Sequence, residues 1–213
     1  MKKIISFAVW GDDPMYLSGI QKNFDLMKKF YPDWQMNVYY DSTVPDEYTK
    51  NEEIKFIKIE DRSHGKMWRF YAAEESDIFI SRDLDSRITA REVYCVNKWL
   101  ETDFKILSIL DHKMHLPYRG CPILAGMFGI RNKLDTNDMN EVKNRLYDFR
   151  HPIDQYYLRD HIYPKYKNDI LTISFETDEY LKNTWNENFI GQGYYENDSP
   201  RYNPITGVPM SKT

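Results

Sequence analysis

Two aspartates separated by one residue, Asp83 and Asp85, follow an apolar segment that ends at Ser81. Side chains at positions i and i+2 of an extended chain point to the same side. Both carboxylates can therefore face one point at the end of a buried strand, an arrangement of oxygen ligands that suits Mg2+ or Mn2+. A cation held there could bridge to a diphosphate. The alternative for so short a motif is a solvated turn or a helix cap.

Basic and imidazole side chains precede this acidic pair, at His64, Lys66 and Arg69. Lys66 and Arg69 are three residues apart, so on a helix they share one face. They could contact a pyrophosphate or the two carboxylates, although a solvated basic face explains the same spacing. The sequence has no glycine-rich Walker or Rossmann fingerprint, which argues against a kinase or a dehydrogenase.

The first predicted strand ends near Trp10. In a parallel α/β sheet the loop after the first strand borders the ligand crevice. Trp10 could therefore contact a nucleotide base whose edge meets the backbone near Ala8. The alternative is that Trp10 packs under the first helix.

Asp111, His112 and His115 follow the fifth predicted strand. A His-x-x-His pair could bind zinc, but no Cys or third His lies at a suitable spacing, so hydrogen bonding to sugar or phosphate is the better interpretation. Loop histidines without a role remain an alternative. Gly126 would permit close approach of a ligand to the backbone, although a bulge or turn also explains it.

Asp154 and Gln155 begin a predicted helix over residues 153–162. A carboxylate at a helix N-terminus is favoured by the helix dipole. By residue type, Asp154 is equally suited to capping the helix and to catalysis.

The elements that must position these residues alternate between strand and helix through the first half of the chain. Predicted strands span residues 3–10, 35–40, 54–59, 77–81 and 104–110, and predicted helices span 14–30, 66–74 and 89–100. This β-α-β pattern predicts one Rossmann-like α/β domain, whose mainly parallel central sheet is covered by helices on both faces. The less regular second half contains predicted helices over 137–149 and 153–162 and a strand over 170–175. We expect the domain to span 1–202, and residues 203–213 to form a linker-like tail that leads to further domains.

Composition limits the function classes. The chain has 213 residues, of which 41% are hydrophobic and 29% charged, as expected for one soluble globular domain. A net charge of −4 argues against general nucleic-acid binding. Two cysteines form no disulfide framework, and no apolar run approaches the ~20 residues of a membrane span. We therefore expect a monomeric domain in a reducing compartment, the cytoplasm.

Several motifs together resemble the GT-A fold nucleotide-sugar glycosyltransferases. They span nearly the whole chain: Trp68-Arg69-Phe70, Arg82-Asp83-Leu84-Asp85, Asp111-His112-x-x-His115, Gly126-Met127-Phe128-Gly129, Asp154-Gln155 and Phe189-Ile190-Gly191-Gln192. The resemblance is to a group found in bacteria and large DNA viruses, including enzymes that act on viral capsid glycans.

This resemblance implies a hexosyltransferase that uses a UDP-sugar of the UDP-glucose or UDP-rhamnose type, Mn2+ or Mg2+, and an oligosaccharide or glycoprotein glycan as acceptor. It implies that Asp85 binds the metal and that Asp83 binds ribose or the metal. Retaining members carry an Asp-Gln pair near the anomeric carbon, which corresponds to Asp154 and Gln155. In an inverting reaction, Asp111 or Asp154 would act as the base. The remaining donor-binding candidates are Ala8, Trp10, His64, Lys66, Arg69, His112 and Gly126.

The chain departs from the family pattern in one respect. Retaining relatives often add a late histidine to the metal shell, yet no histidine follows His161. Water or diphosphate oxygens would then complete the shell.

Two other functions stay open. A sugar-nucleotide pyrophosphorylase would need a glycine-rich, basic loop after the first strand, whereas this chain has the acidic Gly11-Asp12-Asp13-Pro14. The third possibility is a non-catalytic glycan-binding module on the same fold.

Overall fold

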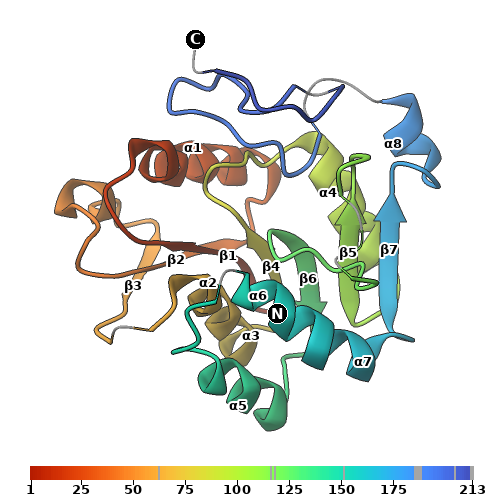
Figure 1. The fold of residues 1–213 in the computed structure, drawn as a ribbon, viewed down its shortest axis with the longest axis horizontal. Helices are drawn as coiled ribbons and strands as arrows, with labels where there is room; N and C mark the ends of the chain where they lie inside the picture. The colour runs from red at the N-terminus through yellow and green to blue at the C-terminus, as the bar shows by residue number, and fades with distance from the viewer. Residues whose placement is uncertain are drawn as a thin grey trace.

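A central sheet organises the molecule. The computed structural model describes residues 1–61, 63–115, 117, 119–150, 152–184, 189–203 and 205–211. In these residues, seven strands lie in the order β3-β2-β1-β4-β6-β5-β7 (Figure 1). The strands are β1 (Lys3–Val9), β2 (Gln35–Tyr40), β3 (Lys55–Lys58), β4 (Ile78–Arg82), β5 (Ile106–Leu110), β6 (Met127–Arg131) and β7 (Ile170–Ser174). Within this sheet, β6 pairs antiparallel with β4 and β5, and the other pairings are parallel.

Helices cover both faces of the sheet (Figure 1). One face carries α1 (Pro14–Phe30) and α4 (Ala90–Leu100), and the other carries α2 (Gly65–Trp68), α3 (Ala72–Glu75), α5 (Thr136–Asn144), α6 (Ile153–Tyr157) and α7 (Tyr163–Tyr166). Successive strand residues face opposite sides, so Ile4 belongs to one buried apolar cluster and Ile5 to the other. The predicted α/β domain with a mainly parallel sheet is confirmed.

Local capping explains where the two long helices begin. The side chain of Asp13 accepts a 2.9 Å hydrogen bond from the N–H of Met15, and Pro14 occupies the first turn of α1. Thr89 caps α4 by accepting a 3.2 Å bond from the N–H of Glu92. The helix predicted over 66–74 is present as three successive short turns, α2, η2 (Arg69–Tyr71) and α3.

Strand β6 occupies the segment that the sequence suggested as a bulge or turn. Gly129 lies opposite Ile80 of β4, and a Cβ atom added there would lie 3.0 Å from side-chain atoms of Ile80 and Trp99. The close packing of sheet and helix therefore favours glycine at this position. Because β6 is antiparallel, it begins at the edge where the parallel strands end, and Met127 pairs with Arg82.

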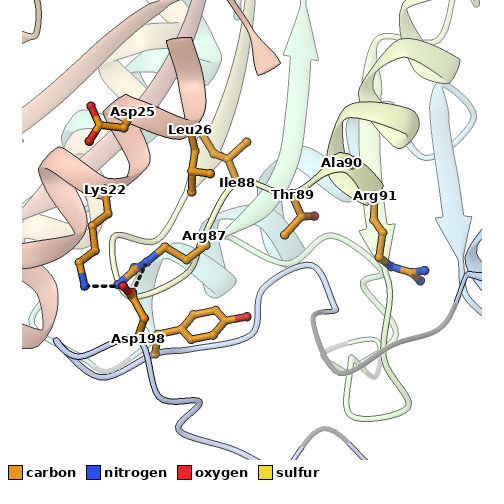
Figure 2. A pocket seen from close by; sticks show the side chains of 10 residues that line it. Lys22, Asp25, Leu26, Arg87, Ile88, Thr89, Ala90, Arg91 and Asp198 are labelled. Atoms are coloured by element: carbon orange, nitrogen blue, oxygen red, sulfur yellow. Dashed lines mark hydrogen bonds and ion pairs between the residues drawn. The ribbon is translucent and has the colours of Figure 1, made fainter. Parts of the chain in front are cut away.

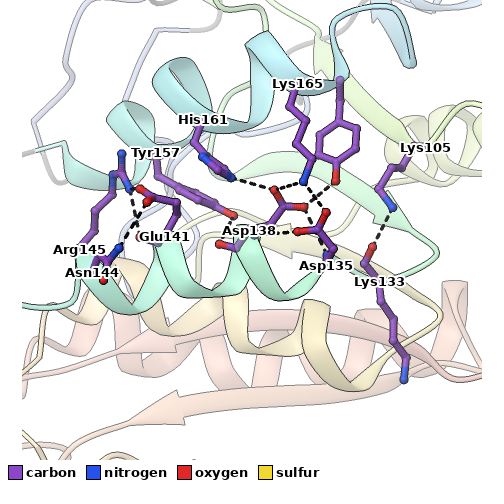
Figure 3. Close-up of polar contacts among 11 residues, drawn as sticks. Lys105, Lys133, Asp135, Asp138, Glu141, Asn144, Arg145, Tyr157, His161 and Lys165 are labelled. Atoms are coloured by element: carbon purple, nitrogen blue, oxygen red, sulfur yellow. Dashed lines mark hydrogen bonds and ion pairs between the residues drawn. The ribbon is translucent and has the colours of Figure 1, made fainter.

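A buried carboxylate anchors the helical segment that begins with α6. This helical segment continues through the π-helical turn η3 (Leu158–Ile162) into α7. Asp138 of α5 is fully buried and receives His161 at 2.8 Å, Lys165 at 2.7 Å and the hydroxyl of Tyr166 at 2.5 Å (Figure 3). Such a multiply bonded buried carboxylate fixes the helix against α5.

The remaining short elements are η1 (Asp46–Thr49) and α8 (Glu179–Asn183). The chain after α8 folds back on itself through isolated bridges that join Tyr194 to Pro200 and Tyr202 to Pro209. Part of the predicted linker-like tail, residues 203 and 205–211, is described here, whereas Pro204, Lys212 and Thr213 lie outside the described residues. In the described part of the chain, no helix has the length and apolar character to span a bilayer.

Candidate active site

A cleft of about 620 Å³ lies where β1 and β4 end. Its walls come from four separate parts of the chain. They are the end of β1 with the loop that follows it (residues 8–13) and Tyr16, the pair Lys66 and Arg69, the loop 83–85, and Asp154. The structure thus brings Ala8, Trp10, Lys66, Arg69, Asp83, Asp85 and Asp154 to one place, because loops after parallel strands share one edge of the sheet.

The Asp83 side chain is open to the cleft and forms an ion pair with the buried Arg69. Arg69, which is 5% exposed, donates a 2.7 Å hydrogen bond from Nη1 to Asp83 Oδ1, whereas the Asp83 side chain is 47% exposed. Partial loss of water around the carboxylate disfavours its charged form, but the Arg69 guanidinium outweighs this and holds the pKa of Asp83 below its ordinary value. Asp83 is therefore ionised and available to a ligand.

Asp85 has a different environment. Burial, followed by the charge of Asp83, raises the pKa of Asp85 to about 6. Its carboxylate forms an ion pair with Arg201, and its backbone oxygen accepts a 2.7 Å hydrogen bond from the N–H of Tyr194. No local pattern points to Arg201, which lies 116 residues along the chain from Asp85.

Gly126 leaves room for the Asp83 carboxylate. A Cβ atom at this position would lie 2.0 Å from Asp83 Oδ2. The backbone here is fixed from β4, because Ser81 Oγ donates to Ala125 O and Arg82 Nη1 donates to Gly126 O, both at 2.7 Å. The predicted close approach at Gly126 is thus made by a side chain of the protein itself.

Asp154 is buried and lines the cleft, whereas Gln155 supports a neighbouring segment. Gln155 Oε1 accepts a 2.6 Å bond from the N–H of Ala125, and Nε2 donates a 3.1 Å bond to Ile123 O. Both ends of this amide therefore hold the backbone that leads into Gly126.

Trp10 presents an exposed indole at the opposite wall. It is 42% exposed and makes edge-to-face contacts with Trp68 at 6.1 Å and His64 at 6.3 Å between ring centroids. Nδ1 of His64 accepts a 3.3 Å bond from the N–H of Lys66. His64 therefore supports the start of α2 and the position of Trp10.

Asp111 and His112 are not among the residues that line the cleft. Asp111 is fully buried, pairs with Arg91 through two hydrogen bonds, and accepts a 2.9 Å bond from the N–H of Ile190. His112 stacks on Phe189 with ring centroids 4.3 Å apart, and borders a separate pocket of about 670 Å³. The physical reason is the insertion of β6, which separates the end of β5 from the end of β4.

The chemistry of the two aspartates fits a hard divalent cation. Both line one cleft with their carboxylates, and the lack of a side chain at Gly126 lets the Asp83 carboxylate take its position there. Across the described residues, no group of three His, Cys, Asp or Glu side chains is placed to hold a metal. A cation held by Asp83 and Asp85 would therefore need water or diphosphate oxygens to complete its shell, as Mg2+-type sites allow.

Known proteins resemble this chain in fold, whereas none matches it in sequence. No model of a protein family matches the sequence, and no curated protein matches it. A glycosyltransferase involved in glycosylation of the major capsid of PBCV-1 matches with a TM-score of 0.52, at 9% identity over 83% of both chains. The galactosyltransferase LgtC, in complex with donor and acceptor sugar analogues, gives 0.50 at 14% identity over 84% of this chain and 81% of its own.

A third match is the mannosyltransferase PcManGT from Pyrobaculum calidifontis, in complex with GDP-Man and Mn2+. Its TM-score is 0.51 at 10% identity, over 81% of this chain and 55% of its own. The chain has the GT-A fold. The predicted resemblance to a capsid glycosyltransferase is confirmed at the level of the fold, and the cleft lies at the ends of β1 and β4 in this fold.

Proposed function

We propose that this protein is a metal-dependent glycosyltransferase that moves a hexosyl group from a UDP-sugar to a glycan acceptor. The observation that carries the proposal is the placement of Asp83 and Asp85 in one cleft with Lys66 and Arg69, at the ligand edge of a GT-A sheet. This combination provides oxygen ligands for a cation and positive charge for a diphosphate.

The basic residues would bind the leaving group. Arg69 keeps its charge at the base of the cleft, because the carboxylates of Asp83 and Asp154 raise its pKa despite burial. Lys66 lies on the same wall and can donate to diphosphate oxygens as negative charge develops there. Mn2+ or Mg2+ bound to the aspartates would supply Lewis-acid neutralisation of the same charge.

The nucleoside would occupy the wall formed by the loop after β1. Trp10 offers an exposed aromatic surface, and the backbone of residues 8–11 lies beside it in the cleft. A base that stacks on the indole would place its edge near Ala8.

Retention is the proposed stereochemical course. Asp154 is placed in the cleft near Arg69, and Gln155 orders residues 123–125 next to Gly126. The acceptor hydroxyl would attack the oxocarbenium-like anomeric carbon from the face of the leaving group, and a phosphate oxygen would take its proton. Asp154 would stabilise positive charge on the sugar.

A UDP-release assay tests the proposal. A panel of UDP-sugars that includes UDP-glucose and UDP-rhamnose is incubated with the protein and Mn2+, with and without EDTA. We expect UDP release from at least one donor, loss of release with EDTA, and a loss of about 100-fold or more in Asp85→Asn. Asp12→Asn is the matched control, since Asp12 is an exposed carboxylate that borders the same cleft.

Two results would contradict the proposal: no donor in the panel gives UDP, or Asp85→Asn retains full activity. NMR of the product's anomeric proton decides between retention and inversion.

A further inference from the structure

The segment from Gly193 to Asn203 passes over the acidic edge of the cleft, and we call it the strap. Arg201 is held in it by backbone contacts on both sides. Its N–H donates to Gly193 O at 2.8 Å, and its carbonyl oxygen accepts from the N–H of Met210 at 2.7 Å. These contacts fix the backbone from which the Arg201 side chain reaches Asp85.

A second contact fastens the strap independently of that side chain. Figure 2 shows Asp198 between Lys22 of α1 and Arg87, two residues after Asp85. The Asp198 carboxylate lies 2.7 Å from Lys22 Nζ and 2.9 Å from Arg87 Nη2. Arg87 is largely buried and also donates to Leu84 O at 3.0 Å, so this contact joins the strap to the loop that carries Asp83 and Asp85.

The Arg201 guanidinium carries a permanent positive charge directly on the carboxylate of Asp85. The Asp85 side chain is 16% exposed, so the pair is shielded from most of the solvent. A divalent cation on the same carboxylate would repel the guanidinium at close range, where screening is weakest. The two cations therefore cannot both be held tightly by Asp85.

We propose that Arg201 is an internal counter-cation that competes with the metal for Asp85. The inference rests on the proposed function, in which Asp85 binds the metal. When the cation enters, the guanidinium leaves Asp85 while the Asp198 anchor keeps the strap in place. The released side chain then lies beside the cleft, where its planar fork can bind diphosphate oxygens. The metal thus replaces Arg201 at Asp85, and the donor diphosphate replaces Asp85 as the partner of Arg201.

Isothermal titration with MnCl2 alone tests this inference. The proteins are the wild type, Arg201→Gln, Arg201→Lys and Lys22→Gln. Lys22→Gln is the control, because Lys22 contacts the strap at Asp198 and makes no ion pair with Asp85. We expect Arg201→Gln to bind Mn2+ at least about tenfold more tightly than the wild type, which corresponds to about 1.4 kcal/mol. Arg201→Lys keeps the charge and should stay within about threefold of the wild type, as should Lys22→Gln.

The inference is overturned if Arg201→Gln and the wild type bind Mn2+ equally, or if neither binds it. Thermal unfolding without metal verifies that each variant is folded before titration. Failure of the proposed function gives a different pattern. In that case Arg201→Gln still binds Mn2+ more tightly, but no UDP-sugar is turned over.

Discussion

Arg69 and Asp83 form an ion pair in which the arginine is buried and the carboxylate faces the cleft, with Nη1 2.7 Å from Oδ1. The Arg69 guanidinium keeps the Asp83 carboxylate ionised, and the second carboxylate oxygen, Oδ2, packs beside Gly126. Arg69 also holds charge next to Asp154, so one guanidinium serves two carboxylates of the site.

Replacing Arg69 by alanine should lower kcat/KM for UDP release about 100- to 1,000-fold, the scale found when one charge-stabilising donor is removed from an active site. Steady-state kinetics with a UDP-sugar and Mn2+ measures the loss. Arg150→Ala is the control, because Arg150 is 71% exposed in its side chain and pairs with Asp148 at the surface. Activity of Arg69→Ala within about threefold of the wild type would remove Arg69 from the proposed machinery.

Gly126→Ala should lower metal-dependent activity about 100-fold. The new methyl group would lie 2.0 Å from Asp83 Oδ2, so the Asp83 carboxylate would have to move. Gly193→Ala provides a matched comparison beside the other aspartate, since its Cβ would lie 3.4 Å from Asp85 Oδ2, in ordinary contact. We expect that variant to keep most of its activity. Equal UDP-release rates in the two variants would argue against the steric explanation.

Trp10→Ala should raise KM for the UDP-sugar about tenfold with a small change in kcat, since the indole is proposed to bind the base and not the reacting atoms. Trp10→Phe keeps an aromatic surface and should recover much of the affinity. Donor titrations with UDP in place of the UDP-sugar measure the same loss directly. An unchanged affinity for UDP in Trp10→Ala would place the nucleoside elsewhere.

Glu92→Ala should destabilise the fold by about 3–5 kcal/mol, because it leaves the buried guanidinium of Arg82 without its ion partner. The two side chains are 1% and 2% exposed, with Nη2 and Oε2 2.9 Å apart. For a chain of this size the melting temperature should fall by about 10 °C in a calorimetric scan. Glu179→Ala, which breaks an exposed pair with Lys182, should change the free energy of unfolding by less than about 1 kcal/mol.

Stability should fall as the pH falls below about 6.5, in part because of His115. Burial, with the charges of His112 and Arg82, lowers the pKa of His115 to about 3. The unfolded chain takes up this proton below about 6.5, so between these values the unfolded state binds more protons than the folded state. Between pH 6.5 and 5 this amounts to about 2 kcal/mol. Urea unfolding at both pH values measures it, and His115→Phe should show a smaller decrease; an equal decrease contradicts the assignment.

Local patterns predicted the elements that carry strong signals of their own. The strand over residues 35–40 and the helix over 14–30 have the same bounds in the structure. The start of the helix is defined by Asp13, which caps it, and by Pro14 in its first turn. Trp10 and Asp83 are predicted near a ligand crevice because each follows a strand of a parallel sheet, whereas Lys66 is predicted there because it shares a helix face with Arg69. All three line one cleft.

Pairing between distant segments could not be predicted in this way. Strand β6 inserts between β4 and β5, and no local pattern shows which strands a segment will join. That insertion places Asp111 outside the cleft, although it follows a strand that ends at the same edge. Arg201 was missed for a similar reason, because its contact with Asp85 depends on how the strap folds back.

The residues that line the cleft, together with Arg201 on Asp85, are spread along the chain from Ala8 to Arg201. A chain that is still being synthesised acquires Asp83 and Asp85 more than 100 residues before it acquires Arg201. Until then the Asp85 carboxylate lacks the guanidinium with which it pairs in the folded protein. This ion pair can therefore form only after residues 193–203 have left the ribosome, so the aspartate loop reaches its final electrostatic environment late in synthesis.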